Sequence, residues 1–282
     1  ISSTNLIISF CNVLSTITIH CDSSISPFVE ELSNVMILIF ENHQISESLQ
    51  VIASLTLPVP SFIQDHLPIF VPYLIRSLQM HENPTVMVPV VSIVPFLVNR
   101  IDLGPFYDVL VEAMFSSLLE GETSTLKIAT LESFYSLINK NDALFAPYIS
   151  QLHGSISFII SNLETVYQKY FESTEKLVRV ISKIQIKFLK ILSLDDSKHV
   201  FNSCVDLFIV ISRIHPLFKY NNVDLSKLLD SMFLAFPEET MEMVTKVPET
   251  IQILRVCLKQ INKSDKEIND LLGIIMCGSE GS

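Results

Sequence analysis

Apolar residues recur at intervals of three and four positions along most of the chain, and they almost nowhere alternate with polar residues. Such series run through residues 128–138 and 177–191. The clearest series consists of Ile63, Leu67, Phe70, Leu74 and Leu78. This spacing lays one apolar stripe along a helix, because side chains three and four positions apart share a face. The pattern therefore predicts an all-α fold.

Start and stop signals agree with this prediction. Asn83 followed by Pro84 is typical of a helix start, with a capping side chain and a proline at the first helical position. Residues 264–267, Ser-Asp-Lys-Glu, have the spacing of a capping box. Gly104-Pro105 and Gly121 are expected to end helices, and the chain holds only six glycines, which leaves little room for β-hairpins.

The helices are expected to occur in pairs. Pro27-Phe28, Pro105-Phe106 and Pro147-Tyr148 begin three similar helices; the last two are 42 residues apart and the first two are 78 apart, which is two units of 39. After each such helix (the A helix) a short polar turn leads to a second helix (the B helix). The B helices are predicted at 45–56, 84–100, 123–139 and 165–193. Two antiparallel helices every ~40–47 residues is the period of HEAT and armadillo-type solenoids, in which neighbouring repeats cover each other's apolar faces.

We therefore expect a right-handed α-solenoid of antiparallel helix pairs, of the HEAT/armadillo type. The chain opens on Ile1 in the middle of the apolar pattern, which predicts that it is the C-terminal part of a longer chain. The alternative is an ordinary helical bundle. Clear repeats are predicted at about 25–60, 61–103, 104–142 and 143–195, and less regular helices over 196–277, near 197–212, 223–235, 248–261 and 264–276.

Charge is unevenly distributed. Residues 1–160 hold four basic and 14 acidic side chains, a net of −10, and residues 161–282 hold 15 and 16, a net of −1. Acidic residues at the A–B turns and on B helices are expected to form a long negative groove that binds a basic partner. The alternative is that they only keep an apolar chain soluble. The candidate partner-binding residues are Glu41, Glu47, Glu82, Glu120, Glu122 and Glu132.

One predicted helix carries the opposite charge. Lys176, Arg179, Lys183, Lys187 and Lys190 follow one another in steps of three and four, which places five cations on one helix face. A solvated face explains this pattern. An acidic or phosphate-bearing partner is the alternative.

The composition excludes several classes of protein. A net charge of −11 and a pI near 5.0 exclude a typical nucleic-acid binder, which needs a basic surface. The apolar run 86–98 contains two prolines and is too short to cross a bilayer, which takes ~20 residues, so no membrane span is expected. Five cysteines without a C-x-x-C pair indicate reduced thiols of an intracellular protein.

The sequence carries no catalytic or metal-binding pattern. Its seven histidines are scattered, and none pairs with another His or Cys at ligand spacing on one helix face. It also lacks a phosphate loop, a dinucleotide fingerprint and a nucleophile elbow. We therefore expect no enzymatic activity, no metal and no cofactor.

Two predicted A helices resemble those of a known family. Residues 61–78, Ser-Phe-Ile-Gln-Asp-His-Leu-Pro-Ile-Phe-Val-Pro-Tyr-Leu-Ile-Arg-Ser-Leu, are similar to an A helix in the C-terminal HEAT repeats of importin β, the nuclear-import karyopherin. Phe145-Ala-Pro-Tyr148, with the helix to Leu163, resembles a later A helix of the same region. The repeat lengths and the order of the B helices are similar as well, over about residues 35–164.

The resemblance implies a nuclear transport receptor, cytoplasmic and nuclear, whose acidic concave face binds a basic segment of an importin-α-type adaptor or of cargo. Glu47, Glu82, Glu122 and Glu132 would carry over the family's acidic contacts. It also implies nucleoporins as a further partner class, with Phe-Gly repeats binding in slots between A helices. The family's main Ran-binding region lies in N-terminal repeats, so most of it is not expected here.

Two departures from the family limit this expectation. The chain has no Trp, so contacts made by inner-face tryptophans cannot carry over. Pro95-Phe96 and Tyr135-Ser136 stand where the family's B helices often hold a small residue followed by Asp. A second hypothesis is a HEAT-repeat scaffold subunit of a larger assembly, such as a vesicle coat or kinase complex, with an exposed apolar strip for side-to-side contacts.

Overall fold

The computed structural model describes residues 3–21, 23–80, 83–165, 171–214 and 223–246, and these residues form helices joined by short turns. The prediction of an all-α solenoid of antiparallel helix pairs is confirmed. The chain divides into two compact units, Ile1–Asn141 and Asp142–Ser282.

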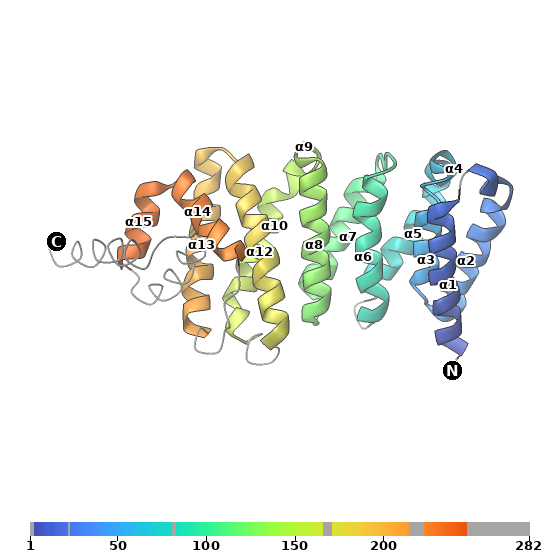
Figure 1. Ribbon diagram of the computed structural model, residues 1–282, viewed down its shortest axis with the longest axis horizontal. Coiled ribbons are helices and arrows are strands. Elements are labelled where there is room, and N and C mark those ends of the chain that lie inside the picture. The colour runs from blue at the N-terminus through green and yellow to red at the C-terminus, as the bar shows by residue number, and fades with distance from the viewer. Residues whose placement is uncertain (1–2, 22, 81–82, 166–170, 215–222, 247–282) are drawn as a thin grey trace. The chain divides into compact units, whose positions relative to one another are not determined.

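Unit 1 consists of two rows of helices (Figure 1). The B row contains α1 (Ser3–His20), α3 (Glu47–Ser54), α6 (Pro84–Val98) and α8 (Ser124–Lys140), each packed against the next. The A row contains α2 (Val29–His43), the short α4 (Pro60–Asp65), α5 (Leu67–Leu78) and α7 (Phe106–Glu120). The helix pairs α2–α3, α5–α6 and α7–α8 join the rows. Each pair thus leaves its apolar sides for its neighbours to cover.

Unit 2 repeats the arrangement. After α9 (Asp142–Phe145) and the 3₁₀ turn η2 (Ala146–Tyr148) come α10 (Ile149–Ser161), α12 (Phe171–Ile191), α13 (Leu194–Ile214), α14 (Val223–Ala235) and α15 (Pro237–Lys246). Helix α10 packs against α13, and α12 packs against both α13 and α14. The predicted helices at 248–261 and 264–276, with the capping box at Ser264, lie outside the described residues.

The core follows the predicted apolar stripes. Leu67, Phe70, Leu74 and Leu78 in α5 are all buried. Between α7 and α8 the ring centroids of Phe115 and Phe134 lie 4.5 Å apart. Each such side chain contributes about 1.5–3 kcal/mol through burial, so the stripes account for most of what holds neighbouring helices together.

Helix starts agree with the proline signals, with two differences. Helix α6 begins at Pro84, but the Asn83 side chain accepts a hydrogen bond from the Thr85 hydroxyl (2.6 Å) instead of capping a backbone amide. The helix predicted through 63–78 breaks at His66 into α4 and α5. Pro68 explains the break, because it has no N–H to continue the backbone ladder. The His66 carbonyl accepts from Ile69 and Phe70 instead, each at 3.0 Å.

Two stretches, Ser23–His43 and Asp142–Ser161, are long and apolar enough to cross a membrane by length and composition. Each combines an α-helix with a 3₁₀ turn that contains a proline, Pro27 in η1 (Ser23–Phe28) and Pro147 in η2. Helix α2 of the first stretch packs against α3, and α10 of the second packs against α13. Buried helices of soluble proteins meet the same criteria of length and apolar composition, so these stretches are weak evidence for a membrane span.

Candidate functional site

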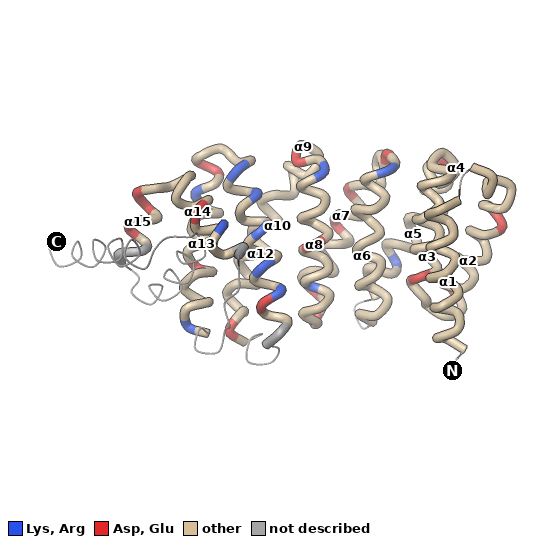
Figure 2. Tube along the Cα trace, in the orientation of Figure 1, with Lys and Arg blue, Asp and Glu red and all other residues tan. Residues whose placement is uncertain are grey.

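Unit 1 carries a strong negative charge, with 13 acidic and four basic residues and a net charge of −9. In Figure 2 acidic positions outnumber basic ones along α1 to α8. Four of the predicted glutamates lie at A–B turns: Glu41 in the last turn of α2, Glu47 at the start of α3, Glu120 at the end of α7, and Glu122 just before α8.

These four glutamates share one edge of unit 1. In a stack of antiparallel pairs, every A helix ends where its B helix begins, so all A–B turns lie on the same edge. We call Glu41, Glu47, Glu120 and Glu122 the acidic turn edge. Glu132 lies elsewhere, exposed near the middle of α8, and Glu82 lies outside the described residues.

Neighbouring hydroxyls orient three of these carboxylates. The Tyr73 hydroxyl of α5 donates to Glu41 Oε1 at 2.9 Å, and this hydrogen bond is the main cause that raises the pKa of Tyr73. Ser116 Oγ donates to Glu120 Oε1 at 2.9 Å, and Ser46 Oγ lies 3.4 Å from Glu47 Oε2. One oxygen of each carboxylate therefore accepts a hydrogen bond from a hydroxyl, while the carboxylate stays at the surface.

The turn between Glu120 and Glu122 is tightly built. A Cβ on Gly121 would lie 2.5 Å from the Ser117 carbonyl oxygen and 2.6 Å from Leu126 Cδ2, so only glycine fits there without a shift. Lys127 Nζ donates to the Leu118 carbonyl at 2.8 Å, and burial lowers the pKa of Lys127. This ammonium satisfies a carbonyl in the last turn of α7. The tight packing of Gly121 and Lys127 thus fixes the backbone that carries Glu120 and Glu122.

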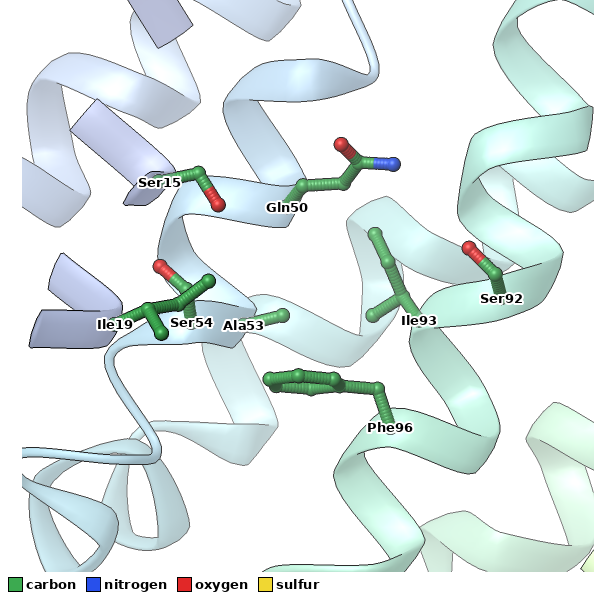
Figure 3. Close-up of a pocket in the computed structure, with 8 residues that line it drawn as sticks. All are labelled: Ser15, Ile19, Gln50, Ala53, Ser54, Ser92, Ile93 and Phe96. Carbon is green, nitrogen blue, oxygen red and sulfur yellow. The ribbon is translucent and has the colours of Figure 1, made fainter. Parts of the chain in front are cut away.

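A pocket of about 170 Å³ opens on the B row, between α1, α3 and α6. Figure 3 shows the Phe96 ring beneath it, with the Ser15 and Gln50 side chains on the other side. Its volume is close to the ~150 Å³ of an apolar cavity that accepts benzene. The pocket is therefore large enough for one apolar side chain, and polar residues form its rim. Its lining residues are Ser15, Ile19, Gln50, Ala53, Ser54, Ser92, Ile93 and Phe96.

Two side chains of opposite charge, Glu47 and Arg100, neighbour residues that line this pocket but do not line it themselves. Glu47, Gln50 and Ser54 follow steps of three and four, which places them on one face of α3. Burial raises the pKa of Cys11 on α1 to about 11, and the negative charge of Glu47 adds to this effect. Just after α6, the Arg100 guanidinium lies 3.6 Å from the centroid of the Phe96 ring. A cation is therefore favoured beside Glu47, at the start of α3.

A second, smaller pocket of about 90 Å³ lies on the A row, bordered by α2, α4 and α5. Its aromatic wall contains Phe62, Phe70 and His66, and the Phe62 and His66 rings stack with centroids 3.9 Å apart. Ile37 and Ile69 complete its apolar lining. In its wall Ser33 Oγ is buried and has no hydrogen-bond partner among the described residues. This pocket suits a small apolar side chain, with an aromatic wall beside it.

Other candidate chemistry is sparse in the described ranges. Nowhere in them do three His, Cys, Asp or Glu side chains gather as metal ligands. Cys11, Cys21 and Cys204 are free thiols; Cys204 is fully buried, which raises its pKa well above the ordinary value. Cys257 and Cys277 lie outside these ranges.

Sequence reasoning found the turn glutamates but missed both pockets. The B-row pocket joins residues from three helices that are far apart in the chain, Ser15, Gln50 and Phe96 among them. One signal was present, since Ser92 interrupts the otherwise apolar run 86–98 of α6 and lies one helical turn from Phe96. Tyr73, 32 residues from Glu41, carried no such signal.

Comparison with known proteins places this arrangement in a family. Residues 1–184 match the family model described as importin subunit beta-1-like, TPR repeats. A solved structure of importin beta, crystallised in an ammonium sulfate condition, aligns with a TM-score of 0.62 at 12% identity, over 94% of this chain and 33% of that chain. The chain therefore spans about one third of that importin beta. A comparison with curated proteins gives no match.

The two findings carry different weight. At 12% identity the structural likeness establishes the solenoid fold alone. The family match rests on sequence and covers well over half of the chain, from residue 1 to residue 184. The repeat lengths, the two rows of helices and this match agree, and the chain belongs to the importin subunit beta-1-like family.

Proposed function

We propose that this chain is part of a nuclear transport receptor that binds a basic segment of an importin-α-type adaptor or of cargo, during protein import into the nucleus. The acidic turn edge carries the proposal. Its glutamates repeat from one helix pair to another, on a unit with a net charge of −9. Such a row attracts a basic partner and sets its register. The membership in the importin subunit beta-1-like family supports a place in the cytoplasm and the nucleus.

The B-row pocket supplies an apolar contact beside this charge. A basic amphipathic helix has cations on one side and apolar residues on the other. One apolar side chain would enter the pocket over Phe96, while a neighbouring cation lies beside Glu47 at the start of α3. The site therefore combines electrostatic attraction with an apolar anchor, the usual combination in a binding groove for an amphipathic helix.

A charge-neutralising variant tests the acidic turn edge. A synthetic Arg- and Lys-rich amphipathic helix is titrated with the whole chain at 0.05 M and 0.15 M salt. The variant Glu47→Gln/Glu120→Gln/Glu122→Gln should weaken binding about tenfold at low salt, since each exposed pair is worth about 0.2–1 kcal/mol. The control Glu31→Gln/Asp65→Asn/Glu112→Gln removes the same charge from exposed positions elsewhere in unit 1.

Each outcome of this titration is decisive. Binding that weakens with salt and is lost in the edge variant, but not in the control, supports the proposal. Equal losses in both variants would assign the effect to net charge alone. No binding at low salt would favour a scaffold role instead, in which the exposed apolar stripe on α1 (Leu6, Phe10, Val13 and Ile17) contacts a neighbouring subunit.

The A-row pocket favours a second candidate function, the binding of nucleoporin Phe-Gly repeats. It is an apolar slot between neighbouring A helices, and the Phe62 and Phe70 rings in its wall offer a surface on which an aromatic ring stacks. Ile69, which lines it, is 55% exposed. Ile69→Asp should abolish binding of a Phe-Gly repeat peptide, whereas Val109→Asp, at a similarly exposed position on α7, should not. Equal binding by a Ser-Gly peptide would contradict this function.

A further inference from the structure

The solvent face of α12 in unit 2 is almost entirely cationic. Between residues 176 and 190, the helix positions that are exposed or half-buried comprise five cations and one isoleucine. The opposite side, with Leu177, Ile181, Ile184 and Phe188, is fully buried. Figure 2 shows basic positions recurring along the length of α12. We call Lys176, Arg179, Lys183, Lys187 and Lys190 the α12 cation face.

Neighbouring anions compensate only part of this charge. Arg179 lies 3.6 Å from Glu175 in an exposed pair, and Lys187, which is half-buried, lies 3.9 Å from Asp142. Among the described residues, Lys176, Lys183 and Lys190 have no carboxylate within ion-pair distance.

The adjoining helices supply few of the missing anions. Helix α14 packs along α12, and the side chains described in it expose one lysine and one aspartate, Lys227 and Asp230. Helix α13 also packs against α12, and it exposes three aspartates, one lysine and one arginine, a net charge of −1. The cation face therefore keeps an excess of positive charge within unit 2.

This charge is not needed for solubility. The whole chain has a net charge of −11, so additional cations bring it closer to neutrality. Like charges three and four residues apart also destabilise a helix, by about 0.2–0.5 kcal/mol per pair. Five cations on one face are thus a cost to the fold that binding of an anion removes.

We infer that the α12 cation face binds an acidic segment of a partner protein. The inference does not depend on the basic partner proposed for unit 1, since it concerns another unit and the opposite charge. From residue 176 to residue 190 a helix rises about 21 Å. An extended chain with acidic residues at alternate positions places a carboxylate about every 6.6 Å on one side. A segment of about seven residues therefore brings four carboxylates along the whole face.

A short acidic segment fits this face better than a nucleic acid does. A polynucleotide continues beyond the face, and its phosphates meet the field of a chain with a net charge of −11. A seven-residue segment is confined to the cations. The half-buried Ile186 beside Lys183 and Lys187 also offers an apolar contact, which suits a protein side chain.

A peptide titration tests the inference. The probe is a fluorescein-labelled twelve-residue peptide that alternates Glu and Ser, titrated with the whole chain at 0.05 M salt. The variant Lys176→Gln/Lys183→Gln/Lys190→Gln should weaken binding about tenfold, from three exposed charge pairs. The control Arg76→Gln/Lys140→Gln/Lys198→Gln removes three exposed cations from other helices and should change affinity less than about twofold. Unchanged circular dichroism of both variants shows that the helices remain folded.

The remaining outcomes overturn the inference. Equal losses in the two variants would mean that only net charge matters. Tighter binding of a labelled twelve-nucleotide single strand, lost in the face variant, would reassign the face to nucleic acid. Binding that is independent of salt, or no binding at 0.05 M salt, would remove the electrostatic basis.

Discussion

The acidic turn edge and the α12 cation face are built on the same kind of helix pair but differ in sign and in geometry. The edge is a discontinuous row, with its glutamates contributed by separate helix pairs of unit 1. The cation face is one continuous helix surface, with neighbouring charges on successive turns of α12. An edge of spaced turns suits a ligand that crosses several repeats, whereas a single helix face suits a short segment lying along it.

The comparison separates what determines the fold from what determines the partner. In both regions buried apolar stripes hold the helices, through Leu126 and Leu131 in α8 and Leu177 and Ile181 in α12. The solvent side of each helix contributes little to packing, so its charge is free to vary. Sharing a solenoid therefore does not require sharing a ligand, even within one chain.

The largest expected effects lie in the cores beneath the two regions. Phe134 in α8 and Phe188 in α12 are both completely buried. Phe134→Ala and Phe188→Ala should each lower the free energy of unfolding by about 3–5 kcal/mol, through lost burial and a cavity. Urea denaturation followed by circular dichroism measures this. If either variant lowers the free energy of unfolding by less than about 1 kcal/mol, buried apolar stripes do not hold the helices in that region.

A smaller effect is expected at the turn that holds two of the edge glutamates. Gly121→Ala should destabilise the protein by about 1–3 kcal/mol, because the new Cβ meets the Ser117 carbonyl and Leu126. It should also weaken binding of the basic helix, since Glu120 and Glu122 move with the backbone. Gly154→Ala is the control, because nothing lies within 4 Å of its Cβ position. Equal stability of the two variants would contradict the steric clash expected at Gly121.

The cation face itself should be slightly destabilising. Lys183 has Arg179 and Lys187 four residues away on either side, so Lys183→Gln removes two repulsive pairs. We expect a gain of about 0.5–1 kcal/mol at low salt, which shrinks at high salt. Glu132→Gln in α8 is the matched change, with uncharged residues three and four positions away, and should leave stability nearly unchanged. A loss of stability in Lys183→Gln would show that its neighbours attract it.

The smallest effect concerns pH and is confined to unit 2. His153 Nε2 lies 3.2 Å from the His199 carbonyl and links α10 to α13; burial is the main cause that lowers the pKa of His153. The unfolded chain, with a histidine pKa of about 6.5, binds this proton at a higher pH than the folded chain does. Stability should therefore fall as pH drops through 6.5. Thermal melts at pH 7.5 and 5.5 should show a smaller fall for His153→Gln.

Local signals in the sequence predicted most helices and the turn glutamates. Apolar spacing located α8 and α12, and the proline signals located the starts of α6 and α7. The spacing could not show the break at His66, since the stripe from Ile63 to Leu78 continues across it. There the missing N–H of Pro68 outweighs the apolar pattern.

The pockets could not be predicted for a different reason. Whether Phe96 lines a pocket or fills the core depends on how closely α1, α3 and α6 pack, which no single helix pattern contains. The same holds for the hydrogen bond between Tyr73 and Glu41, and for Lys127 reaching the end of α7. These contacts join side chains across helices, and only the three-dimensional structure brings them together.

One experiment tests the central claim, that two oppositely charged surfaces of one solenoid bind separate partners. The basic amphipathic helix and the acidic peptide are each titrated, at 0.05 M salt, with the unaltered chain and with the edge and face variants. We predict that the edge variant loses only the basic helix and that the face variant loses only the acidic peptide. If both variants lose both ligands, or neither loses any, the two surfaces are not separate binding sites.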